Sequence, residues 1–125
     1  MRSQDMRPND APTSRDTDIS IISALRTSAR ATLSSRNRSL SEHAQVLGIS
    51  PARLTSSLKQ QDTTLAREIK RLRIDVAKEM LSDPAHNAAS VAEALGYTEQ
   101  SHFARFFRSQ TGLSPREYRR TVKSE

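Results

Sequence analysis

The chain has 125 residues and a mass of 14.0 kDa, which leaves room for one domain or for two very small ones that share a helix. Only 34% of its residues are hydrophobic, and its formal charge of +6 favours a polyanionic partner such as DNA, RNA or an anionic membrane. The absence of cysteine excludes disulfides and thiolate chemistry, and no apolar run approaches the roughly 18–20 residues that span a bilayer.

The N-terminal segment, residues 1–17, mixes proline, asparagine, aspartate and arginine with almost no apolar residue. Such a segment cannot bury enough surface to offset the entropy of ordering it, so we expect a disordered tail, and it does not resemble a signal peptide. A helix becomes plausible from Asp18, which we expect to be its cap. One face of that helix is apolar and carries Ile21, Ile22, Leu25, Ala29 and Leu33.

A first helix-turn-helix is predicted over residues 39–60. Ser39 and Glu42 form a capping box that opens a short helix ending at Gly48. The second helix starts at Ser50 and Pro51, a cap followed by a proline at the first helical position. Asp62 is expected to end it in a left-handed conformation.

A long linking helix is predicted over residues 64–81, because its apolar residues recur at spacings of three and four. A second helix-turn-helix follows at residues 87–110, opened by Asn87, with Phe103 and Phe107 facing inward. Gly112 ends it, and a capping box at Ser114 opens a terminal helix over residues 115–122. The predicted fold is all-α, with about seven helices in two helix-turn-helix subdomains joined by the long helix.

The two predicted turns are copies of each other. The sequence Ala-Gln-Val-Leu-Gly-Ile at residues 44–49 recurs 48 positions further on as Ala-Glu-Ala-Leu-Gly-Tyr at residues 92–97. Two short helices around a glycine turn, made twice in a strongly basic chain, are typical of a DNA-binding protein.

The chain resembles the DNA-binding domain of the AraC/XylS family of bacterial transcription regulators. The resemblance rests on residues 96–108, Gly-Tyr-Thr-Glu-Gln-Ser-His-Phe-Ala-Arg-Phe-Phe-Arg, and on residues 111–119, which include Gly-Leu-Ser-Pro-Arg-Glu-Tyr. It extends from about residue 19 to residue 123 and is looser in the first helix-turn-helix. It implies two recognition helices that enter successive major-groove segments of double-stranded DNA, about 34 Å apart, and contact with RNA polymerase beside the promoter.

The outward positions of the second recognition helix are the strongest candidates for reading bases. Glutamine can pair bidentately with adenine and arginine with guanine. By resemblance, Gln100, Ser101 and Arg105 fall at base-contacting positions, and His102 shares their face. The competing interpretation is a solvated polar face.

In the first unit the predicted outward positions are Ala52, Arg53, Thr55, Ser56 and Ser57, of which the first four are the candidates for contacting bases. Because alanine and short hydroxyls make no strong bidentate contacts, we expect this helix mainly to grip the backbone and to read DNA shape. Phosphate contacts are expected from two helix N-termini and from several cations: Ser39, Lys59, Arg73, Asn87, Arg108, Arg116 and Arg119. The alternative for each cation is an ordinary charged residue at the surface.

No catalytic constellation is present, so we expect neither an enzyme nor any cofactor or metal. His43, His86 and His102 lack metal-ligand spacing, and His43 is expected to be a tolerated core residue. Asp62 stands at the helix end where the second unit has Gly112, and we expect this difference to loosen the first unit.

The predicted function is that of a sequence-specific regulator of transcription, acting as a cytoplasmic, nucleoid-associated monomer with no membrane partner. Two alternatives are a module that binds polymerase or another regulator with weak DNA binding, and a non-specific DNA coater. Met1 favours a stand-alone regulator over a fragment of a ligand-responsive one.

Overall fold

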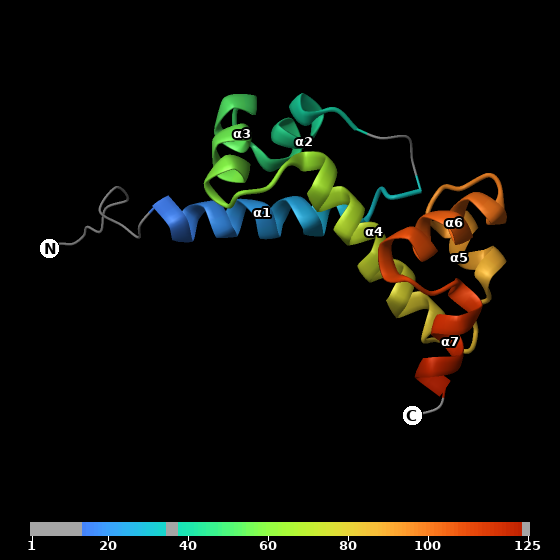
Figure 1. Cartoon of the computed structure of the whole chain (residues 1–125). Helices are drawn as coiled ribbons and strands as arrows, with labels where there is room; N and C mark the ends of the chain where they lie inside the picture. The colour runs from blue at the N-terminus through green and yellow to red at the C-terminus, as the bar shows by residue number, and fades with distance from the viewer. Residues whose placement is uncertain (1–13, 35–37, 124–125) are drawn as a thin grey trace, which may run out of the picture. The chain divides into compact units, whose positions relative to one another are not determined.

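A computed structural model describes residues 14–34 and 38–123 of the chain (Figure 1). Seven α-helices and no strand occur in these ranges, which confirms the predicted all-α fold. In chain order the helices are α1 (Ser14–Arg30), α2 (Leu40–Leu47), α3 (Pro51–Gln60), α4 (Leu65–Leu81), α5 (Ala88–Ala94), α6 (Gln100–Thr111) and α7 (Pro115–Lys123). None of the described helices has the length and apolar character needed to cross a membrane.

The helices fall into two compact units. Unit 1 contains residues 14–29 and 38–68 of the described chain, and unit 2 contains residues 30–34 and 69–123. Each unit therefore holds one helix-turn-helix, α2–α3 in unit 1 and α5–α6 in unit 2. The long helix α4 contributes residues through Glu68 to unit 1 and residues from Ile69 onward to unit 2.

Local capping signals fix the helix starts of unit 1. The hydroxyl of Ser39 accepts from the backbone N–H of Glu42, whose carboxylate accepts in return from the Ser39 N–H, so the predicted capping box is present. Gly48 ends α2 with a φ of 72°, a conformation that costs glycine little. Ser50 caps α3 through the Arg53 N–H. These contacts set the angle at which α3 leaves α2.

The core of unit 1 is aliphatic. Leu25 of α1, Ala44 of α2 and two leucines of α3, Leu54 and Leu58, are buried together. Partly buried residues surround them: Ile21, Ile22, Leu40, Leu47, Ile49 and Leu65. Helix α3, the predicted recognition helix of unit 1, is thus held by contacts with both α1 and α2.

Helix α1 begins earlier than predicted. It starts at Ser14 rather than at Asp18, and Asp18 is not its cap. The side chain of Asp18 lies inside unit 1, 1% exposed, where it accepts a hydrogen bond from Ser57 on α3. Residues 14–17 were therefore wrongly assigned to the tail, because their polar composition does not reveal that the helix continues; residues 1–13 lie outside the described residues.

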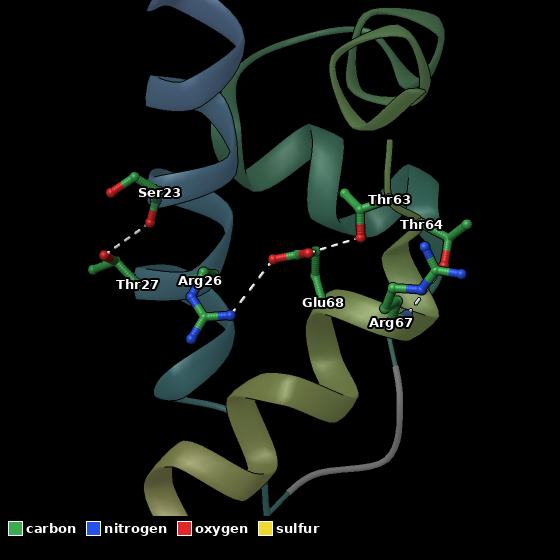
Figure 2. Close-up of polar contacts among 7 residues, drawn as sticks. All are labelled: Ser23, Arg26, Thr27, Thr63, Thr64, Arg67 and Glu68. Carbon is green, nitrogen blue, oxygen red and sulfur yellow. Dashed lines mark hydrogen bonds and ion pairs between the residues drawn. The ribbon is translucent and has the colours of Figure 1, made fainter. Parts of the chain in front are cut away.

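A polar cluster holds α1 and the start of α4 together within unit 1 (Figure 2). Glu68, 5% exposed, accepts from the Thr63 hydroxyl at 2.7 Å and from the Arg26 guanidinium at 3.5 Å. Thr64 accepts from the Arg67 N–H at the first turn of α4. These contacts fix the α3–α4 connection, which includes Asp62 at a φ of 59°.

The core of unit 2 combines buried aliphatic residues, among them Leu72, Leu81 and Leu95, with a set of aromatic rings. Phe103 and Phe107 of α6 are fully buried, and their ring centroids lie 5.8 Å apart. Tyr97 packs on Phe103 at 5.6 Å, and Tyr118 of α7 meets Phe107 edge-on at 5.6 Å. Aromatic pairs in such geometries contribute about 0.5–1.5 kcal/mol each beyond the area they bury. They fix the orientation of the second recognition helix.

Candidate nucleic-acid interface

Helix α3 presents one polar and one buried face. Ala52, Thr55 and Ser56 are exposed, whereas Leu54, Ser57 and Leu58 are buried. Arg53 lies at the border between the two faces, with its side chain 41% exposed. The structure therefore brings the predicted contact residues of unit 1 together on one helix. The prediction was wrong for Ser57, which is buried because its hydroxyl donates to Asp18.

Helix α6 has the same division with stronger hydrogen-bonding groups. Gln100, Ser101, His102 and Arg105 are exposed along the first turn and a half, opposite the buried phenylalanines. The imidazole Nε2 of His102 lies 3.7 Å from a Glu99 carboxylate oxygen just before the helix. An amide and a guanidinium one turn apart can pair bidentately with adenine and guanine edges.

Most residues predicted to hold phosphate lie at the surface. Lys59, Arg108 and Arg116 are exposed. Ser39 and Asn87 are the N-caps of α2 and α5, and the side-chain amide oxygen of Asn87 accepts from the Ser90 N–H. Arg119, partly buried, donates to the backbone carbonyl of Asp83 at 3.0 Å. A contact of Arg119 with DNA would compete with that bond.

Arg73 has partners inside unit 2, with which the predicted phosphate contact would compete. Its Nη1 donates to the Leu95 carbonyl at 2.7 Å, and its guanidinium lies 6.0 Å from the centre of the Tyr97 ring. Burial raises the pKa of the Tyr97 hydroxyl, and the charge of Arg73 opposes that shift. Arg73 therefore stabilises the end of α5. Its place in a run of basic residues does not distinguish this role from an exposed one.

The capping carboxylates keep negative charge at two helix N-termini. The backbone N–H of Ser39 is the main cause of a lowered pKa for Glu42, and the N–H of Ser114 lowers the pKa of Glu117. The Ser114 hydroxyl accepts in turn from the Glu117 N–H at 3.0 Å. These carboxylates accept hydrogen bonds from the backbone N–H groups of the residues that precede α2 and α7.

His43 is a core residue, as expected. It is 3% exposed, and its Nδ1 has no hydrogen-bond partner among the described atoms. Burial lowers its pKa below the usual 6.5, and the charge of Arg38 lowers it further. No group of three metal-ligating side chains occurs in the part of the chain that the structure describes.

The residue that sequence reasoning missed is Asp18. Its carboxylate lies beside Ser57 and Arg53 of α3, with Oδ1 at 2.8 Å from the Ser57 Oγ and 3.8 Å from the Arg53 Nη2. The signal was present, because Asp18 has the helical spacing that places it on the same face as Ile22, Leu25 and Ala29. An acidic residue on an apolar face indicates a buried partner.

A family model described as a helix-turn-helix domain matches residues 43–121, from the first core residue of α2 into α7. The chain belongs to the AraC family of helix-turn-helix DNA-binding domains. The match covers both turns and both recognition helices, so the AraC-type domain includes the two polar faces described above.

Curated relatives agree with this assignment. The uncharacterized HTH-type transcriptional regulator YobQ of Bacillus subtilis is 38% identical over 76 residues, which are 60% of this chain and 32% of YobQ. The arabinose operon regulatory protein of Escherichia coli is 33% identical over 88 residues, 70% of this chain and 30% of the relative. This AraC-type chain thus spans about a third of the length of these relatives. Both are regulators, in agreement with the expectation that the chain is not an enzyme.

The fold also occurs in solved structures. The crystal structure of a DNA-binding transcriptional dual regulator from Escherichia coli K-12 superimposes with a TM-score of 0.74 at 21% identity, covering 98% of this chain and 100% of that one. This likeness shows that the two proteins share a fold.

Proposed function

We propose that this AraC-type domain binds double-stranded DNA sequence-specifically and regulates transcription, with α3 and α6 in successive major-groove segments. The observation that carries the proposal is the division of each helix into a buried apolar face and an exposed polar one. The basic charge of the chain supplies the non-specific attraction.

Within this proposal the two helices have unequal roles. Helix α6 reads bases through Gln100 and Arg105, with Ser101 and His102 beside them. Helix α3 contributes Ala52, Thr55 and Ser56, whose short side chains favour backbone contacts and apolar contact with a thymine methyl group. Lys59, Arg108 and Arg116 supply further phosphate contacts at the surface.

We extend the proposal to a monomer bound at an asymmetric site and, as the family resemblance implies, in contact with RNA polymerase. Sedimentation at micromolar concentration is expected to show one chain per particle, and a stable dimer would contradict this. Cross-linking of the promoter-bound chain to polymerase would test the second partner.

Selection of bound sequences from a random DNA library at moderate salt tests the main proposal. We expect an asymmetric motif covering two major-groove segments. Arg105→Ala should abolish the preference in one segment, because a bidentate arginine contact contributes about 1–3 kcal/mol of discrimination. A chain that enriches no motif and releases DNA as salt rises would instead be a non-specific binder or a protein-interaction module.

Arg108→Ala is the matched control, since it removes an exposed arginine from the same helix. Loss of a phosphate contact should weaken binding to all sequences alike and reduce the salt slope by about 0.9. The motif should be unchanged. If Arg108→Ala altered the motif and Arg105→Ala did not, the assignment of reading and holding residues would be reversed.

A further inference from the structure

A buried acidic residue of α1 lies against the recognition helix of unit 1. Asp18 is 1% exposed and Ser57 is fully buried, and the Ser57 hydroxyl donates to Asp18 Oδ1 at 2.8 Å. The Arg53 Nη2 lies 3.8 Å from the same oxygen. Burying a carboxylate is costly unless polar partners surround it, and here both of these partners come from α3.

Arg53 extends from this buried carboxylate to the surface of α3. Residues 53 and 57 are four apart and so share one helical face, yet the Arg53 side chain remains 41% exposed whereas that of Asp18 is 2% exposed. A guanidinium is a rigid fork with five N–H donors. One nitrogen directed at Asp18 leaves other N–H groups that can reach an acceptor outside the protein.

We propose that Asp18 is a positioning residue for DNA recognition by unit 1, holding α3 through Ser57 and orienting the Arg53 guanidinium toward an acceptor on DNA. The inference rests on the proposed function. The acceptor is an oxygen or nitrogen of the kind found on a guanine edge or a phosphate. An arginine held in place before DNA arrives loses less side-chain freedom on binding.

Helix α1 would thus take part in DNA recognition by unit 1, through the orientation of Arg53. Ala52, Thr55 and Ser56 offer only short side chains, so Arg53 is the one residue among the predicted base-reading positions of α3 that can make a bidentate contact. The short Ser57–Asp18 hydrogen bond holds α3 against α1, and the longer Arg53–Asp18 contact at 3.8 Å can orient the partly exposed arginine.

A double-mutant cycle on the full chain tests the coupling. The variants are Asp18→Asn, Arg53→Ala and both together, measured on a DNA site selected with the unaltered chain. We expect Arg53→Ala to weaken binding about tenfold and Asp18→Asn about threefold. In the Arg53→Ala background Asp18→Asn should have no further effect, because its effect acts through the arginine.

Asp62→Asn is the matched control. It removes the same charge from an exposed position of unit 1, and asparagine also tolerates the left-handed φ of 59° found there. We expect it to leave DNA affinity within about twofold. Thermal unfolding of every variant shows whether a loss of binding reflects a loss of fold.

Arg53→Lys distinguishes the two sources of the acceptor, either of which supports the proposal. Lysine keeps the charge but not the fork. If the partner is a guanine, Arg53→Lys should lose as much affinity as Arg53→Ala and relax the motif at one position under unit 1. If the partner is a phosphate, Arg53→Lys should retain affinity, and Arg53→Ala should reduce the salt slope by about 0.9.

Two results would overturn the inference. One is an equal effect of Asp18→Asn with and without Arg53, and the other is no effect of Asp18→Asn on binding by a folded chain. Should Asp18→Asn fail to fold, NMR relaxation of the Arg53 Nε in the unaltered chain decides, since the proposal requires it to be more ordered than that of exposed Arg108. A chain with a selected motif but no coupling disproves only this inference, whereas a chain with no motif disproves the proposed function.

Discussion

The two units share one helix-turn-helix design but have chemically different interiors. All five aromatic residues of the chain lie in unit 2, where they form one connected set of ring contacts. Unit 1 contains the buried polar residues of the described chain, Asp18, His43, Ser57 and Glu68. A repeated motif can thus be supported by ring packing in one copy and by hydrogen bonds in the other.

This difference matches the contrast between the two recognition helices. Helix α6 is held by its own buried residues Phe103 and Phe107, and it exposes long side chains that can read bases. Helix α3 is held by buried leucines and by the buried carboxylate of Asp18, and most of its exposed side chains are short. In the proposal above, the buried carboxylate of Asp18 orients Arg53 on the helix whose other exposed side chains are short.

The largest effect is expected from removing an aromatic ring from unit 2. Phe103→Ala should reduce the free energy of unfolding by about 3–5 kcal/mol, because a fully buried ring leaves a cavity. Hydrogen exchange should show lost protection in α5, α6 and α7. Retained protection in α2 and α3 would show that the units unfold separately, and equal loss in both would contradict this.

The two equivalent glycines should respond differently to alanine. Both have positive φ, 72° at Gly48 and 87° at Gly96, so each substitution should cost about 1–2 kcal/mol from backbone strain. A Cβ on Gly96 would also lie 2.9 Å from the Ser34 carbonyl oxygen, whereas one on Gly48 meets nothing within 4 Å. Overpacking should add about 1–3 kcal/mol at Gly96 alone. Chemical denaturation of Gly48→Ala and Gly96→Ala measures the difference, and equal losses would refute it.

Acid should weaken unit 1 before unit 2. Because burial lowers the pKa of His43 below 6.5, the folded chain binds fewer protons than the unfolded chain once the pH falls below 6.5. Stability is therefore present above pH 6.5 and lost below it, by at most about 1.4 kcal/mol per pH unit. The capping carboxylates Glu42 and Glu117 act in a separate window, below about pH 4.5.

His43→Val copies the residue that unit 2 has at the equivalent position, Val91, which is fully buried. Thermal unfolding between pH 5 and pH 7, a range centred near the usual histidine pKa of about 6.5, should become less dependent on pH in this variant. The control His102→Gln changes an exposed histidine of unit 2 and should leave the dependence as it was. An unchanged dependence in His43→Val would rule out His43 as its source.

The smallest effect is expected at the ends of the recognition helices. Asp62 has a φ of 59° where the second unit has Gly112 at 83°. Asp62→Gly should stabilise unit 1 by less than about 1 kcal/mol, because relief of strain is partly offset by the greater freedom of glycine in the unfolded chain. Gly112→Asp should have the opposite sign. Denaturation midpoints measure both changes, and a destabilising Asp62→Gly would show that the aspartate is not strained.

The helices and turns were predictable because their signals are local. The serine and glutamate of each capping box, the proline after Ser50 and the glycine at position 48 act on their immediate neighbours in the chain. The apolar periodicity that placed Phe103 and Phe107 inward is equally local. The structure confirms the resulting all-α fold.

Long-range polar contacts were not predictable in the same way. The roles of Asp18 and Arg73 depend on Ser57 and on the Leu95 carbonyl, which are distant in sequence and become neighbours only after folding. An aspartate near a predicted helix start therefore resembles a cap, and an arginine in a basic run shows no sign of an internal partner. The base-reading and phosphate-holding roles of the candidate residues stay predictions.

The division of α1 and the residues after it has a practical consequence for building hybrid regulators. Leu25 is buried in unit 1, whereas Leu33 is buried in unit 2 and the Ser34 carbonyl borders its glycine turn. The region recognised by the family model starts only at residue 43. A graft that began at residue 43 would lack Leu25 from the core of unit 1 and Leu33 from the core of unit 2. A transplanted module must therefore include the segment from Ser14.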